Sequence, residues 1–161
     1  MDFTLSEDQK ALQGAARQFA RGEMAAVAEQ TEREAKPLSR DWVRRYAEMG
    51  FLGVNVPTRY GGLGLGNIEA LLVLEEFAKV SSAVAFPIFE SVVGPVRAIE
   101  HFADADLKNR VVPAVCRGEM MVAVAMSEPD AGTALTDLRT RADVRGDKLV
   151  LNGTKRWCSG G

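Results

Sequence analysis

The sequence has very few of the residues on which metal sites and hydrolytic triads depend. Of its 161 residues, one is a histidine, His101, and two are cysteines, Cys116 and Cys158. A single histidine excludes a multi-histidine metal site and argues against a Ser-His-Asp triad. Two cysteines far apart in the chain indicate neither a disulfide framework nor a zinc site. We therefore expect a metal-free protein of a reducing compartment, which favours the cytoplasm.

The sequence also lacks an excess of one charge and a long apolar run. Its 20 basic and 22 acidic residues are mixed along the chain, with a net charge of −2, so the one-sided basic field of a nucleic-acid-binding protein is absent. The apolar stretch from Val80 to Phe89 contains Pro87 and has about half the length of a membrane-spanning helix. The first residues, MDFTLSEDQK, are acidic where a signal peptide is basic. We expect no nucleic-acid partner, no membrane span and no export signal.

Helical patterns fill the first two thirds of the chain. Ser6 followed by Gln9 is the pattern of a capping box, and apolar residues then recur at helical spacing up to Phe19. Asn67 is a candidate cap for a helix with a broad apolar face. The expected starts of the other helices are Ser39, the region of Ser91, and Asp104, with Pro113 as a kink or break in the last one.

From Glu119 onward the pattern becomes strand-like. Residues 120–126 (MMVAVAM) form a short apolar run, and residues 148–152 (KLVLN) alternate with a period of two. Asn152-Gly153 between two strand-like runs is a hairpin signal. The sequence predicts an α+β fold, with an all-α helical bundle over 1–118 followed by the first strands of an antiparallel β domain over 119–161. Because such a sheet has an open edge, we expect the chain to be part of a longer protein.

A glycine-rich stretch, YGGLGLGN, runs from Tyr60 to Asn67. It does not fit the GxGxxG pattern of dinucleotide-binding loops, since asparagine stands where the third glycine is needed. It also lacks the lysine and hydroxyl residue of a P-loop. The favoured interpretation is a tight connection between two helices, with positive φ at one or more of the glycines.

Two other groups of polar residues are weak candidates for catalysis. Glu75 and Glu76 are adjacent, so on a helix they point about 100° apart and cannot act as a paired acid and base. A solvated helix face, or an ion pair with Lys79, is the favoured role. His101 lies near an expected helix end, where a surface or capping role is favoured over catalysis.

The segment from Ser127 to Thr133 (SEPDAGT) carries the strongest polar signal. It follows an apolar run, and it combines two hydroxyls with Pro129 and Gly132. Such a turn exposes backbone N–H groups beside hydroxyls, which suits a planar polar ring or a phosphate. The residues alone leave a ligand-binding turn and an ordinary β-turn equally open. Trp157 lies in TKRWCS, which we expect to be an otherwise polar strand, and by itself it is more typical of a core or interface residue.

Two segments taken together resemble the acyl-CoA dehydrogenase family. AVAMSEPDAGTALTDLRTRA, and then GDKLVLNGTKRWCSGG, are similar to the family patterns (Y/F)-x-(L/M/V)-(T/S)-E-P-x-A-G-S-D and N-G-x-K-x-W-I-(T/S)-N-(G/A). Supporting similarities are FTLSEDQ near the start, the YGGLG element, the Leu-Glu-Glu helix and KNRVVPAVCRGE before the apolar run. The resemblance covers the whole chain and implies a three-domain fold of which these residues form the beginning.

The resemblance also implies that FAD is the cofactor and which residues contact it. The hydroxyl of Ser127 and the backbone at Met126 would meet the flavin ring edge, Trp157 would pack on the flavin, and Ser159 would reach its N5 region. Thr133 is the residue expected on the acyl-CoA side. The implied cofactor-binding residues are Val124, Met126, Ser127, Gly132, Thr133, Trp157, Cys158 and Ser159.

The sequence departs from the family pattern at several of these positions. Val124 replaces an aromatic residue, Asp130 a common glycine, Ala134 a common aspartate, and Cys158 stands where isoleucine is common. Asp130 would place a negative charge near a pyrophosphate site unless it points to solvent. These departures bear on the substrate class more than on flavin binding.

The family's reaction is α,β-dehydrogenation of an acyl-CoA thioester in fatty acid and lipid metabolism, with electrons passed to an electron-transferring flavoprotein. The family's catalytic base is a glutamate of a C-terminal helical domain that nothing in this chain matches, so no catalytic residue is assigned. We expect these residues alone to bind flavin weakly and to turn over nothing, and a complete protein to be a homotetramer or dimer. The alternatives are a related oxidase, including nitroalkane oxidases, a flavin-dependent monooxygenase, or a non-catalytic helical interaction module.

Overall fold

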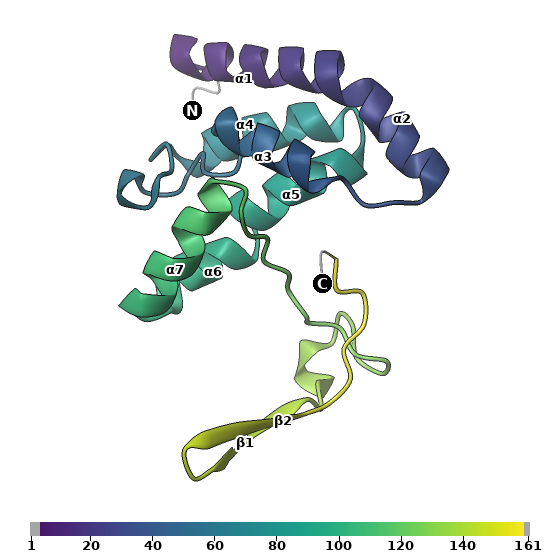
Figure 1. Cartoon of the computed structure of the whole chain (residues 1–161), viewed down its shortest axis with the longest axis vertical. Coiled ribbons are helices and arrows are strands. Elements are labelled where there is room, and N and C mark those ends of the chain that lie inside the picture. Colours follow the sequence, from purple (N-terminus) through teal and green to yellow (C-terminus); the bar gives the residue numbers. More distant parts are fainter. Residues whose placement is uncertain (1–3, 160–161) are drawn as a thin grey trace. The chain divides into compact units, whose positions relative to one another are not determined.

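The computed structural model describes residues 4–159, which form two compact units divided between Val122 and Ala123 (Figure 1). The first unit is helical, and the second carries an antiparallel pair of strands, which confirms the α+β organisation with helices first. The helical unit contains, in chain order, α1 (Glu7–Phe19), a π-helical turn (Ala20–Met24), α2 (Ala25–Glu34), α3 (Arg40–Glu48), a 3-10 turn (Thr58–Tyr60), α4 (Asn67–Ala78), α5 (Ser82–Val92), α6 (Pro95–Phe102) and α7 (Ala105–Cys116). The second unit contains a 3-10 turn (Leu135–Asp137), β1 (Arg141–Arg145) and β2 (Lys148–Asn152).

Local capping sets the starts of α1 and α7. The Gln9 backbone N–H donates to Ser6 Oγ at 3.2 Å, and the Ser6 N–H donates to Gln9 Oε1 at 3.0 Å, which confirms the capping box. At α7 the carboxylate of Asp104 accepts from the Leu107 N–H at 2.8 Å. A cap of this kind satisfies N–H groups that the first helical turn leaves unpaired.

The middle helices differ from the expected ones in two places. Gly66, not Asn67, is the N-cap of α4, because Asn67 already lies in the helix and its side chain accepts from Asn55. The helix expected around residues 91–102 is two helices, α5 and α6, which break at Val93 and Gly94. The stretch Ser82–Phe102 is long and apolar enough to span a membrane by length and composition alone, a test that core helices of soluble proteins also pass.

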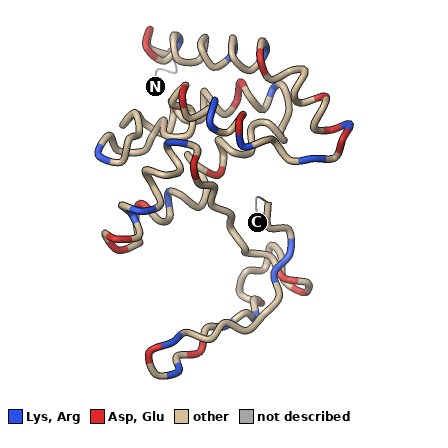
Figure 2. The backbone as a smooth tube through the Cα atoms, in the orientation of Figure 1, with Lys and Arg blue, Asp and Glu red and all other residues tan. Residues whose placement is uncertain are grey.

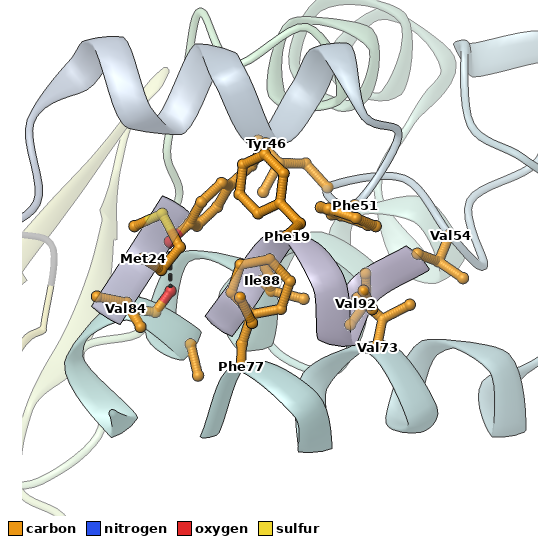
Figure 3. Packing of buried hydrophobic residues seen from close by; sticks show 14 of the residues in the cluster. Phe19, Met24, Tyr46, Phe51, Val54, Val73, Phe77, Val84, Ile88 and Val92 are labelled. Carbon is orange, nitrogen blue, oxygen red and sulfur yellow. Dashed lines mark hydrogen bonds between the residues drawn. The ribbon is translucent and has the colours of Figure 1, made fainter. Parts of the chain in front are cut away.

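Four aromatic rings form the centre of the helical core (Figure 3). Phe19, Tyr46, Phe51 and Phe77 lie with ring centroids 5.0–5.9 Å apart, mostly edge to face. Such pairs contribute about 0.5–1.5 kcal/mol beyond the area that they bury. The Tyr46 hydroxyl donates to the backbone oxygen of Val84 at 3.0 Å, and desolvation raises its pKa. The core therefore joins α1, α3, α4 and α5 through side chains from distant parts of the sequence.

Charged residues of both signs are mixed along the chain (Figure 2). Lys79 pairs with Glu75 at 3.0 Å and with Glu76 at 2.9 Å, which confirms the predicted ion pair. Glu76 is not on a solvated face, however, because it is only 1% exposed and also pairs with Arg17. The burial of Glu76 could not be predicted from the sequence. Because α4 is apolar on most of its circumference, its amphipathic pattern is weak and does not indicate which side faces solvent.

The glycine-rich stretch is a tight connection to α4, as predicted. Gly61 and Gly64 have φ of 85° and 67°. Gly62 lies against the backbone of Val56, where a Cβ would collide with the carbonyl group. These glycines are needed for backbone conformation and close approach.

The strand predicted over residues 120–126 is wrong. These described residues have no strand structure, and Met120, Met121 and Val122 instead pack against the buried clusters of the helical unit. The first residues of the run are partly buried, which accounts for their apolar character, and the two compact units divide within the run, between Val122 and Ala123.

A hairpin forms, but its turn precedes the Asn152-Gly153 turn that the sequence predicted. Strands β1 and β2 pair antiparallel from Arg141↔Asn152 to Arg145↔Lys148, around a turn at Gly146-Asp147 in which Gly146 has φ of 63°. The Asn152-Gly153 hairpin is wrong, since the described residues after Asn152 form no further strand. One apolar face of the hairpin, with Val144, Leu149 and Leu151, is exposed.

Candidate functional site

The two segments that carry the candidate residues lie side by side within the second unit. The Arg156 N–H donates to the backbone oxygen of Ser127 at 2.8 Å. Lys155 Nζ donates to the backbone oxygen of Met126 at 2.9 Å and to Glu128 Oε1 at 2.9 Å. Three consecutive residues of the first segment are therefore bonded to two consecutive residues of the second.

Glu128 is the centre of this network. Its carboxylate accepts from the backbone N–H groups of Arg139 at 2.7 Å and Thr140 at 2.8 Å, in addition to Lys155. Glu128 is 9% exposed. Hydrogen bonds from Thr140, from the Arg139 backbone and from Lys155 lower the pKa of Glu128 to about 2. The carboxylate is ionised at neutral pH, and it ties the turn to the start of β1 and to the second segment.

The turn predicted after Ser127 is present. Glu128 and Ala131 form an isolated antiparallel bridge, with backbone N–H to oxygen distances of 2.8 and 3.3 Å. Asp130 lies on the outside of the turn, 75% exposed, and pairs with Arg139 at 3.5 Å. The negative charge that departs from the family pattern therefore points to solvent and to a guanidinium.

The candidate residues differ in exposure. Val124, Met126 and Trp157 are large apolar residues with 50%, 45% and 82% of their surface exposed. Ser127 and Cys158 are half-buried, and the other candidate residues, Gly132, Thr133 and Ser159, are exposed. The apolar side chains and the hydroxyls thus belong to two chain segments that are bonded together.

Trp157 does not lie in a strand, contrary to the expectation. It has a φ of 61°, a left-handed conformation that bulky residues rarely adopt, and its backbone oxygen accepts from the Ser159 N–H at 3.1 Å. Within the described residues, the indole ring is not part of the core and is not covered by other side chains. A strained backbone that presents a large aromatic ring to solvent is typical of a functional site.

This arrangement suits a flat ring with polar edges. An exposed indole and thioether supply apolar contact, and the hydroxyls of Ser127 and Ser159 supply hydrogen bonds. At Gly132 a Cβ would meet nothing within 4 Å, so there is open space beside the turn. The residues present therefore fit a flavin as far as this unit supplies its contacts.

Sequence reasoning missed Lys155 and Glu128 as parts of the site. Both are in the matched motifs, Glu128 directly after Ser127 and Lys155 two residues before Trp157. The available signal was that acidic residues, Glu128 and Asp130, stand in one motif and basic residues, Lys155 and Arg156, in the other. Only the folded chain shows that Glu128 and Lys155 are the two that pair.

A second polar feature lies inside the helical unit. Glu90 is 5% exposed and lines a small cavity of about 10 Å³ together with Val43, Leu52 and Met120. Desolvation raises the pKa of Glu90. Ile88, two residues before Glu90 on α5, is fully buried in the core.

Comparison with known proteins defines the class to which the chain belongs. Residues 6–119 match the family described as "Acyl-CoA dehydrogenase, N-terminal domain". The 3-sulfinopropanoyl-CoA desulfinase of Cupriavidus necator is 36% identical over 99% of this chain and 40% of its own length. The structure of a glutaryl-coenzyme A dehydrogenase glutaryl-CoA complex matches with a TM-score of 0.91 at 32% identity, over 98% of this chain and 40% of the other. The FAD complex of PigA matches with a TM-score of 0.88 at 26% identity, over 98% and 42%.

The chain therefore belongs to the acyl-CoA dehydrogenase family, and its fold is that of the first part of such proteins. It spans about two fifths of the length of the relatives that it matches. The resemblance seen in the sequence is confirmed over the helical unit, and the structural match extends through the second unit.

Proposed function

We propose that this protein takes part in the FAD-dependent α,β-dehydrogenation of an acyl-CoA thioester. The observation that carries the proposal is the hydrogen-bonded pairing of the Ser127 segment with the Trp157 segment, which presents two hydroxyls and an exposed aromatic ring together. Family membership supports it, as do a relative that binds glutaryl-CoA and a relative that binds FAD.

The residues of this chain would bind and orient the cofactor. Ser127 would hydrogen-bond to the flavin ring edge, Ser159 would lie at the N5 region, and Trp157 would pack against the ring. Thr133 would contact the acyl-CoA side. FAD supplies hydride acceptance when bound, and hydroxyl donors at the ring edge stabilise the charge that develops on it.

The base that removes the α-proton is not assigned to any residue of this chain. The relatives are more than twice as long as the matched region, and the proposed base belongs to a part of the protein that these residues do not include. We further propose an electron-transferring flavoprotein as the electron acceptor, a homotetramer or dimer as the assembly, and fatty acid metabolism in the cytoplasm as the setting. A relative from a structure of an electron transferring flavoprotein supports the choice of acceptor.

A second candidate reaction is desulfination of a sulfinated acyl-CoA, favoured by the 36% identity to the Cupriavidus necator enzyme. An oxidase or monooxygenase of the same fold would differ in its reactivity with oxygen. Assays with an acyl-CoA, with 3-sulfinopropanoyl-CoA and with oxygen as the only electron acceptor separate these reactions by their products.

Tryptophan fluorescence offers a direct test of the flavin site. The chain has two tryptophans, Trp42 and Trp157, so in the Trp42→Phe variant all indole emission comes from Trp157. We expect added FAD to quench this emission at high micromolar or weaker affinity, and Ser127→Ala to weaken the effect. Thr136→Ala, which alters an exposed hydroxyl of the same unit, serves as the matched control.

Quenching no greater than that of free tryptophan at the same FAD concentrations would contradict the proposed flavin site. The same sample, given an acyl-CoA and an artificial electron acceptor, should show no turnover because no base is present. Acyl-CoA oxidation by these 161 residues would show that the assignment of the base to another part of the protein is wrong.

A further inference from the structure

Glu128 and Lys155 are less exposed than the large apolar residues that are expected to meet the flavin. The Glu128 side chain is 6% exposed and the Lys155 side chain 23% exposed. Trp157 and Met126, which are expected to meet the flavin, are far more exposed. The ion pair bonds directly to one of these residues, through the backbone oxygen of Met126, and its two members are the chain neighbours of Ser127 and Arg156.

Lys155 ties its own segment to two residues of the first segment. Its ammonium holds the backbone oxygen of Met126 and the carboxylate of Glu128, both at 2.9 Å. Between these two residues lies Ser127, whose backbone oxygen accepts from Arg156. If the segment with Lys155 moved by one residue along the segment with Ser127, all three hydrogen bonds would break. These bonds together therefore fix one register between the two segments.

The bonds of Glu128 extend the connection to the hairpin. The carboxylate oxygens accept from the backbone N–H groups of Arg139 and Thr140, directly before β1. Glycine at position 153 completes the packing, because a Cβ there would collide with the Thr140 side chain. A single carboxylate therefore connects the turn, the strand entry and the second segment.

We propose that Glu128 and Lys155 are a positioning pair that holds Ser127 and Trp157 in the one register that binds the flavin ring. The pair does not touch the flavin. This inference rests on the proposed function for its ligand, but the register itself is a property of the chain without ligand.

Hydrogen exchange tests the register in the absence of flavin. The Arg156 N–H, which donates to Ser127, is the reporter, and its exchange is followed by NMR in the 161-residue chain. Glu128→Gln replaces a carboxylate oxygen by an NH2 group that cannot accept from a backbone N–H, and Lys155→Met removes the ammonium. We expect each to lower the protection of the Arg156 N–H by roughly tenfold or more.

Lys148→Met is the matched control. Lys148 lies on β2 and makes no ion pair within residues 4–159, so this variant changes the charge of the same unit without touching the pair. Its Arg156 protection should equal that of the unchanged chain. Unaltered Arg156 protection in Glu128→Gln and Lys155→Met would overturn the proposal.

The second measurement adds FAD and follows the signals of the Ser127 amide and the Trp157 indole N–H. In the unchanged chain and in Lys148→Met, FAD should shift both signals with one affinity. In Glu128→Gln and Lys155→Met, the shifts should shrink and the affinity should fall by roughly tenfold, while the exchange of the α1–α7 amides stays unchanged. Equal FAD shifts in variants that have lost Arg156 protection would contradict a positioning role.

If the proposed function is wrong, the measurements give a different result from the one expected if the positioning role is wrong. If FAD shifts neither signal in the unchanged chain, flavin is not the occupant of this site and the proposed function is wrong. In that case the exchange of Arg156 still decides whether the pair sets the register of the two segments.

Discussion

The guanidinium of Arg17 on α1 makes two hydrogen bonds to the carboxylate of Glu76 on α4, 3.1 and 3.0 Å long, and Glu76 is 1% exposed. Lys79 contributes a third bond at 2.9 Å. A carboxylate buried this deeply is stable only while its partners remain, because an unpaired buried charge is strongly unfavourable. The pair therefore couples the first helix to the helix that follows the glycine-rich connection.

Arg17→Met is expected to destabilise the helical unit. The substitution keeps most of the apolar stem but removes two of the three bonds to Glu76, so the thermal midpoint should fall by about 5 °C or more. Lys10→Met is the control on the same helix, since within residues 4–159 the ion-pair partner of Lys10 is the exposed Glu7 and surface pairs contribute little. Circular dichroism melts measure both, and equal midpoints for the two variants would contradict the role of Arg17.

Acid should destabilise the helical unit in a window set by Glu76. Bonds from Arg17, opposed by desolvation and assisted by Lys79, lower the pKa of Glu76 to about 2, from 4.5 for an unperturbed glutamate. Between these values the unfolded chain binds more protons, so stability is fully present above about pH 4.5 and is lost as the pH falls towards 2. Glu76→Gln should flatten this part of the denaturation profile measured by urea unfolding at several pH values. A slope that survives the substitution would assign the effect to other groups.

Predictions from sequence succeeded where a structure depends on residues close in the chain. The capping box joins Ser6 and Gln9, and the cap of α7 joins Asp104 and Leu107, each three residues apart. The hairpin was misplaced because Asn152-Gly153 is a good local turn signal, whereas pairing of β1 with β2 places the turn at Gly146.

The parts that could not be predicted depend on distant contacts. The run 120–126 reads as a strand, but partial burial against the helical clusters accounts for the apolar character of its first residues. The bond between Lys155 and Glu128 joins residues 27 positions apart. No periodicity or spacing specifies such a pair, so the sequence could indicate by resemblance the residues expected to meet the flavin, but not the ion pair beside them.

Glu90→Met is expected to stabilise the protein at neutral and alkaline pH. Desolvation raises the pKa of Glu90, so the folded state holds its proton to a higher pH than the unfolded state, and stability falls as the pH rises above about 4.5. Methionine is unbranched and suits the apolar surroundings of Val43, Leu52 and Val96. Thermal midpoints from pH 4 to pH 8 should show a gain of a few degrees at pH 8 that shrinks towards pH 4. A gain independent of pH would point to improved packing instead of removal of a buried charge.

Two glycine-to-alanine substitutions should have opposite effects on stability. At Gly62 a Cβ would collide with the backbone of Val56, so Gly62→Ala must displace the connection before α4 and should destabilise the helical unit by about 1–3 kcal/mol. At Gly14, inside α1, a Cβ would meet nothing within 4 Å. Alanine there removes the entropic cost of a helical glycine and should stabilise by up to about 1 kcal/mol. Urea unfolding followed by circular dichroism gives both values, and a neutral Gly62→Ala would show that the connection can shift away from Val56 without cost.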